Sequence, residues 1–83
     1  MSEVQQLRQK IDQIDFQLAL LIDQRLTLAK SIINLKQQLG QAKTDPEREK
    51  EIYLQIEKLS RLQNPASVQK IFSQIIAEGK SLT

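Results

Sequence analysis

The chain has 83 residues, a formal net charge of +2 and neither cysteine nor histidine. Its length leaves room for one core, so we expect residues 1–83 to form a single domain. The absence of cysteine and histidine excludes a disulfide framework, a thiol nucleophile, the commoner zinc sites and the usual general base. The longest apolar run, Leu18 to Ile22, is too short to span a bilayer, and basic and acidic side chains alternate. We therefore expect a cytoplasmic protein that binds neither membrane nor nucleic acid.

The composition favours helices, because Leu, Ile, Gln, Lys and Glu are plentiful and only two glycines and two prolines interrupt them. Gly40 ends the first apolar pattern. Asp45, which precedes a proline, is a good helix cap, and Asn64 repeats this arrangement. The sequence predicts an all-α fold with three helices, at residues 4–39, 46–62 and 66–80.

In the first predicted helix, apolar residues recur at alternating spacings of four and three from residue 7 to residue 39. A helix of about 36 residues would be roughly 54 Å long, whereas a compact chain of this size has a radius of gyration near 12 Å. The helix should therefore protrude and expose its leucines and isoleucines unless a partner covers them. A homodimer joined along this helix is the simplest solution.

Four cations fall on the predicted apolar faces. Arg25 stands in the seam of the first helix, and Lys36 lies within about 20° of the same face and ~16 Å further along the axis. Arg8 is roughly 25 Å from Arg25, so only a two-fold related chain could bring it to the same ligand. Arg48 is in line with the apolar face of the second helix. Long basic side chains often lay their stems on apolar surface, but four that converge indicate a buried anionic ligand.

Two acidic residues stand beside these cations. Asp45 is first a helix cap and only second a candidate site residue. Glu49 follows Arg48 in the first turn of the second helix. It is either a surface residue or part of the same site.

These residues follow a known pattern. The stretches LRQKIDQID and LALLIDQRLTLAKSIINLK, followed by DPERE, resemble the all-helical chorismate mutases, and the resemblance covers nearly the whole chain. The motif combines leucine-arginine, two isoleucine-aspartate pairs, an arginine at plus seventeen, a lysine eleven further on, and aspartate and arginine-glutamate after a short loop. The resemblance implies an intertwined homodimer with two equivalent sites, each built from both chains.

The resemblance also implies roles in the conversion of chorismate to prephenate. Arg25 and the partner subunit's Arg8 would hold the two carboxylates, and Lys36 would contact a carboxylate and the ether oxygen. The remaining site residues would surround the ring: Arg48, Glu49 at the ring hydroxyl, Asp45 at the loop end, and Ile32, Ile52 and Ile76 as apolar walls. The rearrangement is concerted, so it needs orientation and charge stabilisation, and no nucleophile, metal, cofactor or proton shuttle.

The end of the third helix departs from the family pattern. In an ungapped alignment Gly79 replaces a serine that meets a carboxylate, and Thr83 replaces a glutamine that meets the ether oxygen, whereas a gapped alignment would use Ser81. We therefore expect a weak mutase, or one that a partner activates. Two alternatives stay open. One is a lyase of the same fold that removes pyruvate from isochorismate, which Glu49 disfavours, and the other is a non-catalytic helical dimer that keeps the anion pocket.

Overall fold

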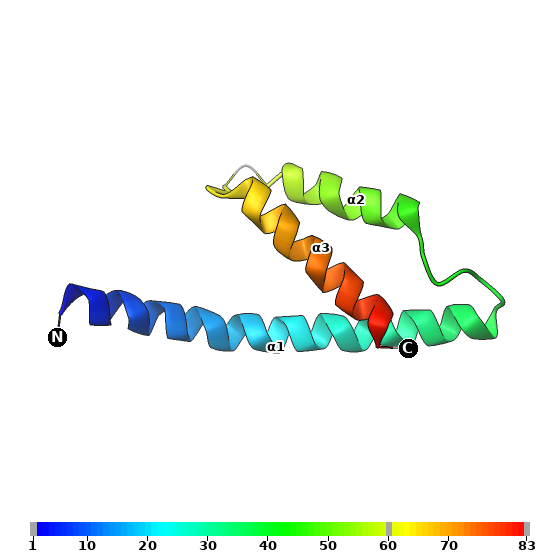
Figure 1. The fold of residues 1–83 in the computed structure, drawn as a ribbon, viewed down its shortest axis with the longest axis horizontal. Helices are drawn as coiled ribbons and strands as arrows, with labels where there is room; N and C mark the ends of the chain where they lie inside the picture. Colours follow the sequence, from blue (N-terminus) through cyan, green and yellow to red (C-terminus); the bar gives the residue numbers. More distant parts are fainter. Residues whose placement is uncertain (1, 60, 83) are drawn as a thin grey trace.

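A computed structural model of the chain describes residues 2–59 and 61–82. Three helices follow one another, α1 (Glu3–Gln38), α2 (Pro46–Glu57) and α3 (Pro65–Ser81), and the described residues contain no strand. In Figure 1, α1 runs the length of the molecule, α2 lies across from it, and α3 crosses obliquely between the two. The predicted all-α fold with three helices and a long first helix is confirmed.

α1 has a start and a stop that its own sequence explains. The Ser2 hydroxyl accepts a hydrogen bond from the Gln5 N–H (3.1 Å), and the Gln5 side chain accepts one from the Ser2 N–H (3.2 Å), which forms a capping box. At the other end Gly40 has a φ of +70°, and the Gln41 N–H donates to the Lys36 carbonyl (2.8 Å). This left-handed turn satisfies a carbonyl of the last turn. The predicted bounds of this helix are confirmed to within one residue.

α2 begins at the predicted cap but ends early. The Asp45 carboxylate accepts a hydrogen bond from the Arg48 N–H (3.1 Å), and a proline stands in the first turn. The predicted end at residue 62 is wrong, because the helix stops at Glu57. No glycine or proline stands between Glu57 and Asn64, so local preference does not mark this end. The stop follows from tertiary structure, since the chain must turn back there for α3 to pack against α2.

α3 agrees with the predicted range to within one residue at each end. Its cap differs from the expected one: Asn64 occupies the cap position, but its side chain makes no capping hydrogen bond. The start of the helix therefore depends on Pro65 in the first turn, whose ring fixes φ near the helical value.

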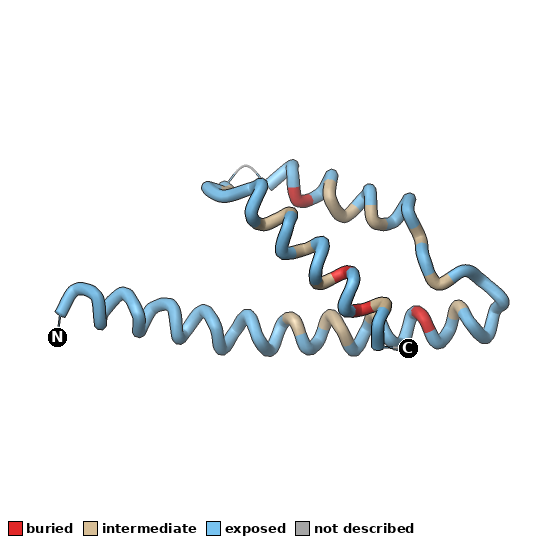
Figure 2. Tube along the Cα trace, viewed as in Figure 1, coloured by how far each residue is buried: buried red, intermediate tan, exposed pale blue. Residues whose placement is uncertain are grey.

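The molecule is elongated, with extents of 57 × 24 × 15 Å and a radius of gyration of 16.1 Å. Among the described residues its buried apolar core is one isoleucine from each helix, Ile33, Ile56 and Ile76. Figure 2 shows the first half of α1 exposed along its whole length. The prediction that the first helix protrudes, with much of its apolar seam uncovered by its own chain, is confirmed. No helix in the described part of the chain has both the length and the apolar character needed to cross a membrane.

α3 holds the other two helices at a fixed separation, because it packs against both while the described residues of α1 and α2 do not pack directly on each other. The contact with α1 is close at Gly79, which is buried. A Cβ atom placed there would lie 3.3 Å from the Cβ of Ala29. The position that aligns with the family's serine is therefore a helix crossing, which brings the end of α3 beside α1.

Candidate active site

A pocket of about 250 Å³ lies between the second half of α1, the start of α2 and the end of α3. Eight of the ten predicted site residues line it: Arg25, Ile32, Lys36, Asp45, Arg48, Glu49, Ile52 and Ile76. The other lining residues were not predicted as site residues: Ala29, Ile33, Lys43, Gly79 and Lys80. The volume is just below the range of about 300–1,000 Å³ that is usual for small-molecule pockets.

Arg25 is half-buried in the second half of α1. Its Cζ lies 5.8 Å from the ring centroid of Phe72 on α3, a cation–π contact that holds the guanidinium against the apolar interior. No carboxylate within residues 2–59 and 61–82 forms an ion pair with it. The guanidinium therefore keeps its N–H donors for an anion from outside this part of the chain.

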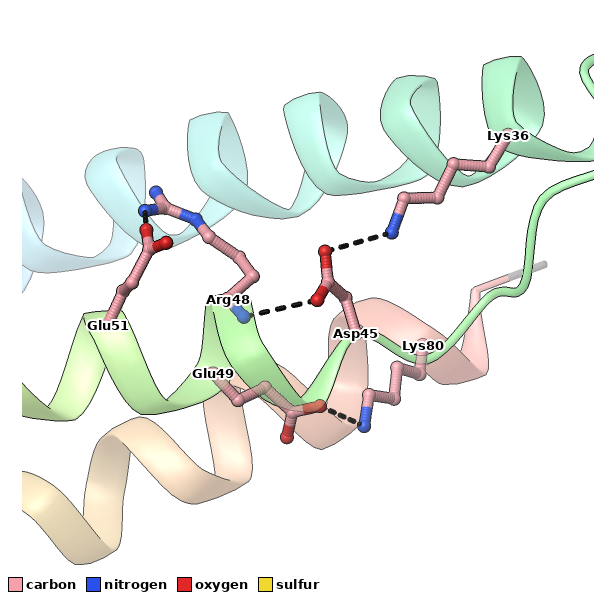
Figure 3. A network of polar contacts seen from close by, with 6 residues as sticks. All are labelled: Lys36, Asp45, Arg48, Glu49, Glu51 and Lys80. Atoms are coloured by element: carbon pink, nitrogen blue, oxygen red, sulfur yellow. Dashed lines mark hydrogen bonds and ion pairs between the residues drawn. The ribbon is translucent and has the colours of Figure 1, made fainter.

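Asp45 connects the end of α1 to the start of α2. One carboxylate oxygen caps α2 by accepting from the Arg48 N–H, and the other lies 3.7 Å from Nζ of Lys36 (Figure 3). This second contact is long for a charge-assisted hydrogen bond, so the Lys36 ammonium retains donors for a ligand. Asp45 thus has both a capping contact and a place at the pocket.

Arg48 lines the pocket from α2, but its guanidinium pairs with Glu51 on the same helix at 3.0 Å. Both side chains are more than half exposed, at 56% and 62%. The prediction that Arg48 faces inward therefore holds only in part. An exposed pair of this kind is weak, and a bound anion can compete for the arginine.

Glu49 forms the shortest ion pair among those of the described residues, with Lys80 at 2.8 Å, and neither side chain is more than one-third exposed. Lys80 was missed in the sequence, although it stands four residues after Ile76 and so shares its helix face. Lys43 was missed because it lies in the loop before α2, where helical periodicity carries no information.

Three candidates lie elsewhere. Arg8 is on the exposed first half of α1 and is not part of its own chain's pocket, in keeping with the predicted separation from Arg25. Thr83 lies outside the described residues. Ser81, the alternative from a gapped alignment, donates its hydroxyl hydrogen to the Glu78 carbonyl (2.8 Å) and does not line the pocket.

The charges around the pocket favour an anion. Five cationic side chains and two carboxylates line it: Arg25, Lys36, Lys43, Arg48 and Lys80 against Asp45 and Glu49. Apolar side chains supply most of the remaining wall. The site can hold a small apolar ring that carries more than one negative charge.

Two comparisons with known proteins identify the family. A profile of the family described as chorismate mutase type II matches residues 7–83. A chorismate mutase from Methanocaldococcus jannaschii is 43% identical over 79 residues, which are 93% of this chain and 80% of that protein. Both carry the mutase name, which favours the mutase over the lyase and the non-catalytic dimer. The chain thus belongs to the type II chorismate mutase family, and the family and the enzymatic activity predicted from the motif are confirmed.

Proposed function

We propose that the protein converts chorismate to prephenate in a homodimer with two equivalent sites, each made of one chain's pocket and Arg8 of the partner subunit. The observation that carries this proposal is Arg25, a half-buried guanidinium in the pocket without a carboxylate partner among the described residues. A permanent charge in such surroundings is stabilised when an anion pairs with it. Chorismate brings two carboxylates.

The charged residues have different roles in the concerted rearrangement. Arg25 and the partner subunit's Arg8 each hold a carboxylate, which folds the flexible substrate into its reactive shape. As the C–O bond breaks and the new C–C bond forms, negative charge grows on the ether oxygen, and Lys36 donates a hydrogen bond to it. No proton is transferred, so the reaction does not require a titrating side chain.

The apolar side chains of the pocket contact and position the ring of the substrate. All three predicted wall residues line the pocket, where Ile76 is buried, Ile52 is half-buried and Ile32 is exposed. Together they exclude water from one side of the ring, which strengthens the electrostatic contacts of Arg25 and Lys36.

The surface area supports a dimer. The chain exposes 7072 Å², whereas a compact monomer of 9.6 kDa exposes about 5,100 Å². Covering the excess on both chains would remove about 4,000 Å² from water, which is within the range of obligate homodimers. The exposed large hydrophobic residues lie mainly on α1, and those of its first half are Val4, Leu7, Ile11, Ile14, Phe16, Leu18 and Leu20.

The described end of α3 supplies no uncharged donor to the pocket. Gly79 has no side chain, and the Ser81 hydroxyl is bonded to its own helix. Without a second donor at the ether oxygen, we expect turnover about 100-fold below that of a site with two donors. This agrees with a weak mutase or one that a partner activates.

The test is the rate of chorismate loss and prephenate formation by the purified protein. Arg25→Ala should lower kcat/KM by about 10²- to 10³-fold, because a charged contact to the reacting molecule is lost. Arg61→Ala, which removes an exposed arginine between α2 and α3, is the matched control and should have little effect. Isochorismate serves as the second substrate. Release of pyruvate from it in preference to chorismate turnover, or an Arg25→Ala protein as active as the control, would contradict the proposal.

A further inference from the structure

An ion pair that no sequence pattern indicated closes one side of the pocket. Nζ of Lys80 lies 2.8 Å from Oε2 of Glu49, and this joins the last turn of α3 to the first turn of α2. Both residues line the same pocket as Arg25. Figure 3 shows the two side chains reaching toward each other between the helices.

The pair differs from the other ion pair of α2 in exposure and in what it joins. The Lys80 and Glu49 side chains are 32% and 26% exposed, and they stand 31 residues apart in the chain. Arg48 and Glu51 are about twice as exposed and belong to one helix. Salt and solvent screen an exposed pair, whereas a partly buried contact between two elements fixes the direction of each side chain.

The fixed group is a carboxylate with acceptor capacity to spare. An ionised carboxylate has about four lone-pair positions on two oxygens. Lys80 occupies Oε2, and no other group in the described part of the chain donates to Glu49. Oε1 is therefore left as an acceptor for a hydroxyl of a bound molecule.

Lys80 also reduces the electrostatic repulsion between Glu49 and an anionic ligand. An unpaired Glu49 would repel a dianion in the same pocket, and its flexible side chain would be driven toward solvent. With Lys80 at 2.8 Å the charge of Glu49 is offset while its oxygen stays in place.

We propose that Lys80 is a positioning residue that holds the Glu49 carboxylate in place to accept the ring hydroxyl of chorismate, an inference that rests on the proposed function. Lys80 acts through Glu49 and does not contact the breaking bond. The selectivity of the site for a hydroxylated ring then depends on a residue at the end of α3.

A double-mutant cycle in kcat and KM tests this assignment. Lys80→Met and Glu49→Gln should each lower kcat/KM by about tenfold or more, since a hydrogen bond to a charged group is lost. The double variant should be within about twofold of Glu49→Gln alone, because a lysine that acts through Glu49 has nothing left to position. Lys80→Arg should recover most of the activity. Lys70→Met, an exposed lysine on the same helix, is the control.

Two outcomes of this cycle would overturn the assignment: a Lys80→Met protein within twofold of wild type, or an equal loss from Lys80→Met in the Glu49→Gln background. The second outcome would mean that Lys80 attracts the anion directly. A protein with Glu49→Lys and Lys80→Glu together keeps the ion pair but exchanges the positions of its charges. It therefore tests whether the pair positions the carboxylate or only holds the two helices together. This protein should unfold at the wild-type temperature but remain inactive. Recovered activity would mean that the ion pair only holds α2 and α3 together.

The proposed function is tested separately, by turnover in the wild-type protein alone. If wild type does not turn over chorismate, the same cycle is measured as Kd for prephenate by calorimetry, since the product keeps the ring hydroxyl. Coupled losses in Kd would support the positioning role even then, and independent losses would overturn it.

Discussion

The two halves of α1 follow the same apolar pattern but have different surroundings. In the second half, α3 covers one face of the helix, so that Ile33 is 5% exposed and Ala29 meets Gly79. The apolar seam itself stays open there as well, since Leu28 and Ile32 are 65% and 56% exposed. In the first half, seam residues such as Ile14 remain 60% exposed. The periodicity of a sequence therefore specifies which helix face needs a cover, and it does not specify whether the cover comes from the same chain.

The largest expected effect follows from placing Arg8 and Arg25 in different halves. Arg8→Ala and Arg25→Ala should each lower kcat/KM by about 10²- to 10³-fold. When the two inactive proteins are unfolded and refolded together, each mixed dimer should contain one intact site. Specific activity should then return to about a quarter of the wild-type value for random pairing. An inactive mixture would mean that Arg8 does not complete the partner's pocket.

A charge placed on the first half of α1, which its own chain leaves uncovered, should show whether a partner chain packs there. Ile14→Asp would be almost neutral in an isolated chain, because Ile14 is exposed there. Against a partner helix it should cost about 2 kcal/mol or more per chain through lost apolar burial and a charge taken out of water. Sedimentation velocity and urea unfolding would show dissociation and a lower midpoint. Gln17→Asp, which adds the same charge on a polar stripe, is the control, and equal behaviour of the two would argue against a dimer along this seam.

In the second half of α1, stability should depend on the size of the side chain at the crossing with α3. Gly79→Leu should lower the free energy of unfolding by about 1–3 kcal/mol, because Ala29 leaves no room at the helix crossing. Leucine favours helices over glycine, so any loss must come from packing. Ala77→Leu on the same helix is exposed and should change stability by about 0.5 kcal/mol or less. Thermal unfolding followed by circular dichroism measures both, and a stable Gly79→Leu protein would refute the close crossing.

The smallest effect is expected where α1 stops. Gly40 has φ +70° and nothing within 4 Å of a built Cβ atom, so Gly40→Ala tests backbone strain without any clash. It should cost about 1–2 kcal/mol at most, and Gly40→Asn less, because asparagine tolerates the left-handed region better. Urea midpoints of the three proteins give the order, and an unchanged alanine variant would show that the turn has rearranged.

The helices could be predicted because their signals are local. The capping residues, the breakers and the apolar spacing of α1 all lie within a few residues of the feature that they encode. The end of α2 could not be predicted, since it depends on where α3 packs. Asn64 shows the same limit: the residue type suits a cap, but its side chain makes no capping bond.

The lining of the candidate pocket was predictable where residues sit on helices with a clear apolar face. Arg25 and Lys36 reach the pocket as their spacing predicts. The unpredicted contacts join separate elements: Phe72 stacks on Arg25, and Lys80 pairs with Glu49. Such pairs follow from how the helices cross, which one helix's periodicity does not contain.

The small size of the core has a consequence for how the stability of the protein depends on its concentration. Only three apolar side chains among the described residues are buried, which is a small core to set against the conformational entropy that ordering the chain costs. The proposed association would therefore have to stabilise the fold, so that folding and assembly become one bimolecular event. The melting temperature should then rise with protein concentration. In a cell, activity at low abundance should increase more steeply than the amount of chain present.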